Sequence, residues 1–536
     1  NFVSSNMNVV NCLVLLLSIA TVALASNAGP DEYFPAFHFR PPKNWINDPN
    51  GPMLYNGVYH MFYQYNPNAS VWGDMNWGHA VSRDMLQWTN LPIALSPTEA
   101  YNKGGVFSGS ATITADGPIL DFSVQAGDCQ GIAVPKNATD PFLVEWEYPS
   151  YNPIIPTEPS GLFGFRDPTE GWKDADGRWN ILVGSGEANS KLGGALLYTS
   201  VDDTWKEWDY KGYFYSNDGI GNMWECPDFF PIPNSEKYTS DGRTYWLIKA
   251  SACNGNIKEW WSVGNYTPNS SSNFQAVAAA MGQDSQMYDY GKFYASKTFY
   301  DSAHDQRVLW AFVGEMDSVQ SYVARGWANM MNVPRAVTCE AVTNCHTIAT
   351  YPIIQFNSLR YGQANLGNFN LAPGKNEHVY NLVTTQGDLE LTAPINQFES
   401  GKTYKFGVYV MATEDLEEYT SVLISVTLDN ENGLQVSFSQ DLSHSSSSSG
   451  ANKSIISGPV TVYPGEEEIH LRVIIDHSIV EAFIQHGRRA ITSRVYPVAG
   501  NESKAIFVSN EGGSEVIIDQ MQAWEVKSTN VEYTNQ

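Results

Sequence analysis

Three acidic residues occupy sequence settings that suit acid–base chemistry. Asp48 lies in NWINDPNG and Asp167 in FRDP, where the following proline biases each acid toward an extended backbone. The positive charge of Arg166 is expected to keep Asp167 ionised. Glu225 lies in WECPDFF, between Trp224 and a cysteine. Apolar neighbours beside other carboxylates would favour its protonated form, so we expect Glu225 to donate a proton.

An Asp-Pro pair is also common turn punctuation, so one such acid does not establish a site. The aromatic and amide side chains near these acids favour a catalytic role over a simple turn: Trp45, Asn47, Gln64 and Trp72. Together they predict a sugar pocket with acid–base catalysis. The ten histidines are scattered, and neither CxxC nor HxxxH occurs, so we predict no metal site and no cofactor.

The overall composition narrows the class of partner. The chain has 536 residues, of which 43% are hydrophobic, enough to build two or three domains. Its formal net charge is −26, and its basic residues never form a run that could follow phosphates or anionic lipid. We therefore expect no nucleic-acid partner and no membrane partner for the mature chain.

The N-terminal segment predicts entry into the secretory pathway. Residues 1–25 contain an apolar run that ends in Ala23-Leu24-Ala25, a signal-peptide pattern, although the absence of Lys or Arg before it leaves a membrane anchor as the alternative. Six Asn-x-Ser/Thr sequons agree with that route: Asn68, Asn137, Asn265, Asn269, Asn452 and Asn501. Among the cysteines beyond the signal, Cys339 and Cys345 are the natural candidates for a local disulfide, which spacing alone does not prove.

The elements that must position the acids are all β. Residues 34–355 read as short strands punctuated by Gly, Pro, Asn and Asp, which predicts a propeller or a sandwich without a repeat clear enough to count blades. Residues 360–536 alternate over longer strands, which predicts a β-sandwich. Asp476 and Glu481 lie on one of these strands, where we expect them to face solvent or pair across a hairpin. The second domain is then structural support.

Several long motifs resemble one enzyme family. NDPNG, FRDP, WECPDFF, YDYGKFYASKTFYD and ITSRVYP are similar to segments of the plant acid invertases and fructan enzymes of glycoside hydrolase family 32. The resemblance runs from about His38 to the C-terminal strand. It implies a five-bladed β-propeller that carries the active site, followed by a β-sandwich.

The resemblance also implies roles for individual residues. Asp48 would be the nucleophile on a fructosyl unit, Glu225 the acid/base, and Asp167 the stabiliser of the transition state, in a retaining double displacement. Other positions would bind substrate: Asn47, Gln64, Trp72, Ser108 and Arg166.

Two departures from the invertase pattern bear on the acceptor. Phe107, in VFSGSAT, stands where invertases usually have Trp, so an indole N–H donor is missing. The stretch from Lys249 to Trp261 lacks the Asp that holds the glucose part of sucrose in invertases; Asn254 is the nearest candidate, and Lys258 is a candidate for the base that follows it. Plant fructosyltransferases lack that Asp too, as do fructan exohydrolases.

These departures predict a fructosyltransferase that moves a fructosyl unit from sucrose to sucrose or a fructan, with β(2-6) links. The alternative is a cell-wall-type invertase or a fructan exohydrolase that uses water, and neutral drift in an invertase would explain the same departures. A catalytically silent sugar-binding protein is disfavoured by the intact acids. Sucrose and fructo-oligosaccharides are the expected partners, and we expect a monomer in the vacuole, with the apoplast as second choice.

Overall fold

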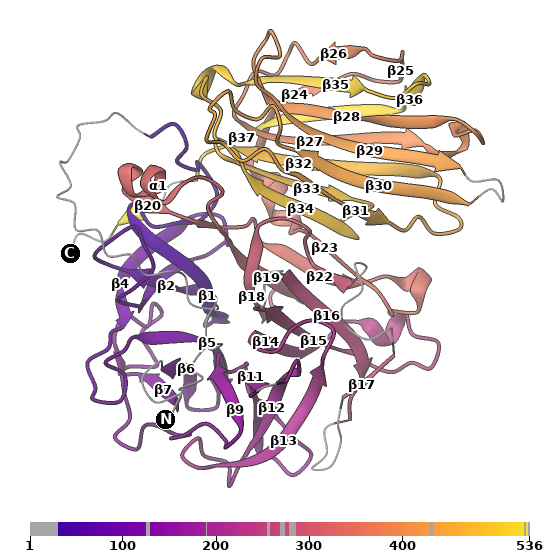
Figure 1. The fold of residues 1–536 in the computed structure, drawn as a ribbon. Coiled ribbons are helices and arrows are strands. Elements are labelled where there is room, and N and C mark those ends of the chain that lie inside the picture. The colour runs from indigo at the N-terminus through magenta and orange to yellow at the C-terminus, as the bar shows by residue number, and fades with distance from the viewer. Residues whose placement is uncertain are drawn as a thin grey trace, which may run out of the picture.

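The N-terminal domain consists of five antiparallel β-sheets arranged as blades around an axis (Figure 1). The computed structural model describes residues 31–124, 129–188, 190–253, 258–267, 274–277, 286–428, 433–529 and 532–533. The signal segment 1–25, Asn254 and Asn269 therefore lie outside the described residues.

The inner strands of the blades form a closed ring. Strand β1 contacts β5, β5 contacts β9, β9 contacts β14, β14 contacts β18, and β18 returns to β1. Blade one contains β1 (Asn44–Tyr55), β2 (Val58–Asn66), β3 (Asn76–Ser82) and β4 (Trp88–Leu95). Blade two contains β5 (Val106–Thr114), β6 (Gly117–Val124), β7 (Cys129–Pro135) and β8 (Trp146–Glu147). Blade three contains β9 (Leu162–Arg166), β10 (Trp172–Lys173), β11 (Trp179–Glu187), β12 (Gly193–Ser200) and β13 (Trp208–Asn217). Blade four contains β14 (Trp224–Pro231), β15 (Trp246–Ala252), β16 (Lys258–Asn265) and β17 (Gln275–Ala276). Blade five contains β18 (Phe293–Asp301), β19 (Gln306–Val313), β21 (Met330–Met331), β22 (Arg335–Cys339) and β23 (Ile348–Pro352). The five-bladed propeller is thus confirmed.

Two short parallel pairings extend blade one. Strand β20 (Trp327–Ala328) pairs with β1, and β38 (Glu532–Tyr533) pairs with β4, so the end of the chain returns to the first blade. Among the described residues the one α-helix is α1 (Val319–Arg325), capped by the Ser318 side chain. None of the described helices is long and apolar enough to cross a bilayer. Isolated 3-10 turns cover Ser235–Lys237, Ala341–Thr343, Ile354–Leu359, Ile395–Gln397 and Gly500–Glu502.

The C-terminal domain is a sandwich of two six-stranded sheets. The first sheet has the order β24 (Arg360–Asn365), β37 (Gln520–Val526), β27 (Gln386–Pro394), β32 (Glu468–Asp476), β33 (Ile479–Ile484), β34 (Arg489–Arg494). The second has the order β26 (Asn376–His378), β35 (Ala505–Asn510), β28 (Thr403–Ala412), β29 (Thr420–Leu428), β30 (Leu434–Asp441), β31 (Ile455–Val460). A two-stranded pair joins β25 (Phe369–Leu371) to β36 (Val516–Ile518). The described chain is therefore all-β in both domains.

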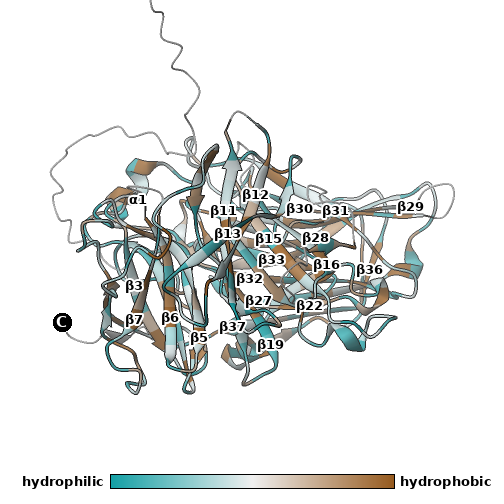
Figure 2. Cartoon of the chain, turned by 90° about the horizontal axis from the view of Figure 1, so that it is seen from below, coloured by the Kyte–Doolittle hydropathy of each residue, from teal (hydrophilic) through white to brown (hydrophobic). Residues whose placement is uncertain are grey.

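The burial of individual strands explains their sequences. Every residue of β3 is buried, because its blade is covered on both faces, whereas β30 alternates between buried and more exposed positions at the side of the sandwich. Figure 2 shows hydrophobic and hydrophilic residues interleaved along the strands of both domains. Buried Val408, Ile424 and Val473 belong to the hydrophobic core of the sandwich. The disulfide of Cys339 and Cys345 joins the end of β22 to the turn that follows it.

A buried ionic cluster joins the two domains. His38 Nδ1 lies 2.8 Å from Asp476 Oδ2, and its Nε2 lies 2.9 Å from Glu481 Oε1. Arg335, in blade five, binds Glu481 and also reaches Asp289 at 3.0 Å. Burial opposes a charge on His38, but hydrogen bonds to the two carboxylates raise its pKa, and the same bonds help to lower the pKa of Asp476.

The expectation that Asp476 and Glu481 face solvent is therefore wrong, whereas both do pair across a hairpin, Asp476 opposite Ile479 and Glu481 opposite Ile474. Both are fully buried, and Asp476 also accepts hydrogen bonds from the backbone N–H groups of Ala36, Phe37 and His38. Where the sandwich packs against the propeller, side chains that strand alternation alone would assign to solvent are buried. Their shared partner His38 lies more than 400 positions away in the chain, where local pattern carries no information.

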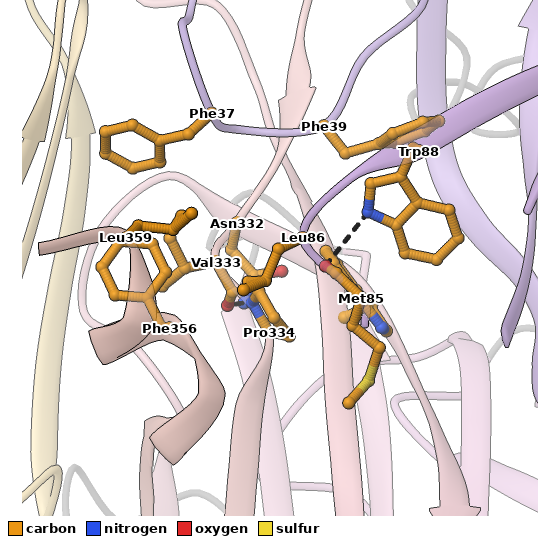
Figure 3. Close-up of a pocket in the computed structure, with 11 residues that line it drawn as sticks. Phe37, Phe39, Met85, Leu86, Trp88, Asn332, Val333, Pro334, Phe356 and Leu359 are labelled. Atoms are coloured by element: carbon orange, nitrogen blue, oxygen red, sulfur yellow. Dashed lines mark hydrogen bonds between the residues drawn. The ribbon is translucent and has the colours of Figure 1, made fainter. Parts of the chain in front are cut away.

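A small apolar cavity lies at the same junction, away from the three predicted acids. Phe37, Trp88 and Phe356 line it, and the Trp88 indole donates to the Met85 carbonyl, as Figure 3 shows. Its volume is about 10 Å³, about the space of one water molecule. The cavity is a packing defect between domains and is too small to hold a sugar.

Candidate active site

The inner strands carry irregularities where the predicted site residues lie. The β1 register shifts between Ile46 and Pro49, and that of β5 shifts between Val106 and Gly109. Asp48 and Ser108 lie within these two shifts. Similar shifts occur in β14 after Glu225 and in β18 after Tyr294. A β-bulge of this kind re-aims a side chain that regular pairing would direct elsewhere.

Asp48 lies within a set of hydrogen-bond donors. The Ser108 hydroxyl donates to Asp48 Oδ2 at 2.5 Å, and the Asn47 amide donates to Oδ1 at 2.8 Å. The Trp45 indole donates to the Asn47 oxygen at 2.8 Å and so fixes which way that amide points. Burial raises the pKa of the Asp48 carboxyl, whereas the bonds from Ser108 and Asn47 oppose the rise. Because Asp48 is only half-buried, its carboxylate stays within reach of a ligand.

Asp167 is buried beside Asp48. Its Oδ2 accepts the backbone N–H of Cys226 at 2.9 Å, and its own N–H donates to the Ser123 hydroxyl at 2.8 Å. Burial raises the pKa of Asp167 to about 6, and the charges of Asp48 and Glu225 add to the rise. Arg166 opposes it, as the sequence predicted, but burial is the larger effect. The expectation that Arg166 keeps Asp167 ionised is therefore wrong near and below pH 6.

Glu225 has polar neighbours in place of the expected apolar surrounding. Arg166 donates to Glu225 Oε1 from Nη2 at 2.5 Å and from Nε at 3.2 Å. The Tyr294 hydroxyl donates to Oε2 at 2.6 Å. The adjacent Trp224 is fully buried, while the carboxyl of Glu225 remains partly accessible. The apolar residues around Glu225 in the sequence thus pack into the blades, and the acid itself meets a guanidinium and a phenol.

The expected substrate-binding residues differ in how they contact the acids. Ser108, Asn47 and Arg166 contact the acids directly. Trp72 and Phe107 pack edge to face beside them, with ring centroids 5.9 Å apart and planes at 78°.

Gln64 has a supporting position. It is buried, and its amide donates to the Val106 carbonyl at 3.0 Å, so it holds the start of β5 in place. Lys258 binds the Tyr290 carbonyl. Asn254, the other residue of that departure, lies outside the described residues.

The structure adds two residues that sequence reasoning did not assign. Tyr294 belongs to the motif YDYGKFYASKTFYD, whose sequence gives no reason to choose one of its tyrosines. The Cys226 thiol lies 3.4 Å from both Asp48 Oδ2 and Asp167 Oδ2. Cys226 has a φ of 43°, a backbone conformation rare for a side-chain-bearing residue, which turns its N–H and thiol toward the acids.

The arrangement of these side chains is typical of one class of enzyme. Three carboxyl groups meet on or beside the inner strands of the propeller, with a guanidinium and hydroxyl donors around them, and a carboxylate-based glycosidase or transglycosidase uses groups of these kinds. No group of three or more His, Cys, Asp or Glu side chains suited to a metal occurs within the described ranges.

Comparison with known proteins identifies the family. Residues 38–352 match the glycosyl hydrolases family 32 N-terminal domain, and residues 355–525 match the family 32 C-terminal domain. The chain belongs to glycoside hydrolase family 32. It is 36% identical to an acid beta-fructofuranosidase of Vigna radiata var. radiata, over 95% of this chain and 84% of the relative. It is 34% identical to an insoluble beta-fructofuranosidase isoenzyme of Arabidopsis thaliana, over 93% of this chain and 91% of the relative.

A solved structure gives the same result. The crystal structure of fructan 1-exohydrolase IIa from Cichorium intybus overlays with a TM-score of 0.87 at 36% identity, covering 94% of this chain and 99% of that one. A variant of that exohydrolase was solved in complex with 1-kestose. The chain is therefore a family 32 enzyme that acts on fructosides, as a hydrolase or a transferase.

Proposed function

We propose that this enzyme transfers a fructosyl unit from sucrose to sucrose or a fructan by a retaining double displacement. Asp48 attacks the anomeric carbon of the fructosyl unit while Glu225 gives its proton to the glycosidic oxygen, and glucose leaves. The resulting fructosyl ester on Asp48 is then attacked by an acceptor hydroxyl, whose proton Glu225 takes back. Asp167 binds fructosyl hydroxyls and stabilises the transition state.

The surroundings of each acid support these roles. Donors from Ser108 and Asn47 orient the Asp48 carboxylate and disperse its charge. Arg166 and Tyr294 hold the two oxygens of Glu225 in one orientation while leaving the carboxyl partly accessible, as a group that gives and takes a proton requires.

Phe107 is the observation that carries transfer over hydrolysis. It directly precedes Ser108, which donates to the proposed nucleophile, and its ring lies against Trp72. A tryptophan here would bring an N–H donor to the rim, whereas phenylalanine brings none. A hundredfold change in the partition between water and sugar requires only about 2.7 kcal/mol, so one rim residue suffices.

Hydrolysis is the second candidate, and the names of the relatives are the observation behind it. Relatives at 33–37% identity carry beta-fructofuranosidase names, and the similar solved structure is a fructan exohydrolase. The same machinery serves both reactions, because only the molecule that attacks the fructosyl ester differs. We place transfer first on the strength of Phe107 and the missing Asp.

Product analysis on concentrated sucrose tests the proposal. A transferase releases glucose in excess of fructose and accumulates longer saccharides, which linkage analysis would identify as β(2-6). Free fructose equal to free glucose at all sucrose concentrations would overturn transfer in favour of hydrolysis. Glu225→Gln, which cannot exchange a proton, is the matched test of the shared machinery: turnover close to wild type would remove Glu225 from the acid/base role.

We also propose a secretory route ending in the vacuole, with the apoplast second. The relatives include a vacuolar and an insoluble isoenzyme of Arabidopsis thaliana. Sequon residues Asn68, Asn137 and Asn501 are exposed, so oligosaccharides could be attached there without disturbing the core. A fluorescent fusion of the full chain in plant cells tests the compartment, and retention in the cytosol would contradict it.

A further inference from the structure

A fully buried ion pair lies in the same blade as the proposed acid/base, and the mechanism above does not use it. Lys249 Nζ on β15 lies 2.9 Å from Glu259 Oε2 on β16, and neither side chain has any exposed surface. An isolated buried charge pair contributes little to stability and is often replaceable by apolar residues. Its location therefore suggests a task other than holding the blade together.

Glu259, one member of the pair, lies in line with Glu225. In the blade-four register Glu225 is opposite Ser251, and Ser251 is opposite Glu259. Residues directly opposite one another in a sheet share a face, so the three side chains form one row across β14, β15 and β16. The Ser251 hydroxyl donates to Glu259 Oε1 at 2.6 Å. Glu259 is thus connected to the strand beside the acid/base.

Glu259 also reaches across to blade five. It accepts the Ser296 backbone N–H on Oε1 at 3.2 Å and the Ser296 hydroxyl on Oε2 at 2.8 Å. Ser296 lies in the register shift of β18 between Tyr294 and Lys297, after Ala295 at a φ of 52°. A bulge removes such an N–H from the strand ladder, and a buried N–H without an acceptor is costly.

The bulge is anchored on its other side as well. The Lys297 ammonium is buried and donates to the carbonyls of Pro168 at 3.1 Å and Pro227 at 3.0 Å. These prolines follow Asp167 and Cys226 in the chain. The segment that begins at Tyr294 is therefore fixed between two contacts, one to Glu259 and one to the turns that carry the other acids.

We propose that Glu259 is a positioning residue for the acid/base, which acts by holding the β18 bulge that aims the Tyr294 hydroxyl at Glu225. The proposal rests on the acid/base role given to Glu225 above. Glu259 touches neither Glu225 nor, on this account, the substrate. Without its acceptor oxygens the bulge can relax toward regular pairing, which turns Tyr294 away from Glu225.

Three variants separate positioning from packing. Lys249→Met with Glu259→Leu removes both charges and every acceptor, without leaving an unpaired charge. Lys249→Met with Glu259→Gln keeps an amide oxygen for the Ser296 N–H. Arg472→Met with Asp388→Leu removes a similarly buried ion pair from the sandwich, where the two groups lie 2.7 Å apart, and serves as the matched control.

Initial rates of glucose release from sucrose give the readout, because glucose appears whichever acceptor follows. We expect the Leu variant to lower kcat about 10- to 100-fold, the effect of losing a hydrogen bond to a charged group, with KM changed less than about twofold. The Gln variant should regain most of that loss, and the sandwich control should keep wild-type kinetics. Leu-variant kcat within about threefold of wild type overturns the proposal.

A double-mutant cycle identifies the route of the effect. If Glu259 acts through Tyr294, the Leu variant adds less than about threefold to the loss already caused by Tyr294→Phe. Losses that multiply in full overturn the proposal. If the Leu variant does not fold, Ser296→Ala takes its place in the cycle. We expect Ser296→Ala to lower kcat about 3- to 10-fold in the wild-type background and to have no further effect in the Tyr294→Phe background. An unchanged kcat for Ser296→Ala alone overturns the proposal too. Glu225→Gln with near-wild-type turnover would instead refute the acid/base role itself.

Discussion

Replacing Asp167 by Asn should stabilise the enzyme at neutral pH while abolishing most of its activity. The carboxyl is buried, and its pKa rises from 3.8 to about 6 in the fold. A raised carboxyl pKa means that the fold binds the proton more tightly than the unfolded chain does. Ionising Asp167 therefore costs stability, and the cost is fully present above pH 6.

The size of the effect follows from the shift. Each pKa unit corresponds to 1.36 kcal/mol, so a rise of about two units costs about 3 kcal/mol at pH 7. Asparagine cannot ionise and escapes this cost. Its amide oxygen can still accept the Cys226 N–H. Its NH₂ group can donate to the Ser123 hydroxyl, which in the wild type donates to Asp167 Oδ1 at 3.4 Å and to the Ser108 carbonyl at 2.9 Å, so this bond persists with its direction reversed. At pH 4 the wild-type acid is protonated in the fold and partly protonated in the unfolded chain, so the difference is nearly gone.

Thermal unfolding of the two proteins between pH 4 and pH 7 measures this difference. We expect equal melting temperatures near pH 4 and a variant that melts a few degrees higher at pH 7, with kcat reduced at least about 100-fold. Asp116→Asn, in an exposed turn, is the matched control and should show no such divergence. A stability difference that does not grow with pH, or a variant less stable at pH 7, would refute the reasoning.

Three other changes test separate parts of the structure. Phe107→Trp should move the partition toward water, read as a rise in free fructose per glucose; an unchanged ratio would reduce Phe107 to packing. His38→Gln should destabilise the domain junction by about 3 kcal/mol or more near pH 5, because Asp476 and Glu481 both lose the charge of His38 and only Glu481 keeps an ion pair with Arg335. The raised His38 pKa gives stability below pH 6.5 that is lost as pH rises through the folded value, whereas the lowered carboxyl pKa values give stability above about pH 4 that is lost in acid. The gap between His38→Gln and wild type in urea denaturation should therefore be widest between those limits, and a gap that widens above pH 7 would contradict the assignment. Arg166→Lys should lower kcat about tenfold or more in glucose-release assays, because one of the two N–H groups that Arg166 donates to Glu225 is lost. A rate within twofold of wild type would show that Arg166 does not orient Glu225.

Local sequence signals predicted the parts of the fold that depend on neighbours in the chain. Alternating hydrophobicity and turn residues predicted an all-β chain with two differently patterned regions. The Asp-Pro settings singled out Asp48 and Asp167, which the structure brings together. The blade count came only from family resemblance. The sequence has no internal repeat clear enough to count blades. The ring closes through packing of β18 on β1, which are far apart in the chain.

The surroundings of the acids could not be predicted for a similar reason. Arg166 directly precedes Asp167 in the chain but donates to Glu225, because β9 ends at Arg166 and the backbone turns at Asp167, where φ is 64°. Tyr294 reaches Glu225 only through a bulge whose position no propensity encodes. Asp476 and Glu481 are buried by a second domain.

The bulges on the inner strands have a consequence for how such an enzyme diversifies. Phe107 and Ser108 are excluded from the ladder of β5, so a substitution at either position leaves the pairing of Val106 and Gly109 untouched. The blades can stay constant while the residues in the bulges drift. A propeller of this family can thereby alter the residues beside its acids without altering the pairing of its strands.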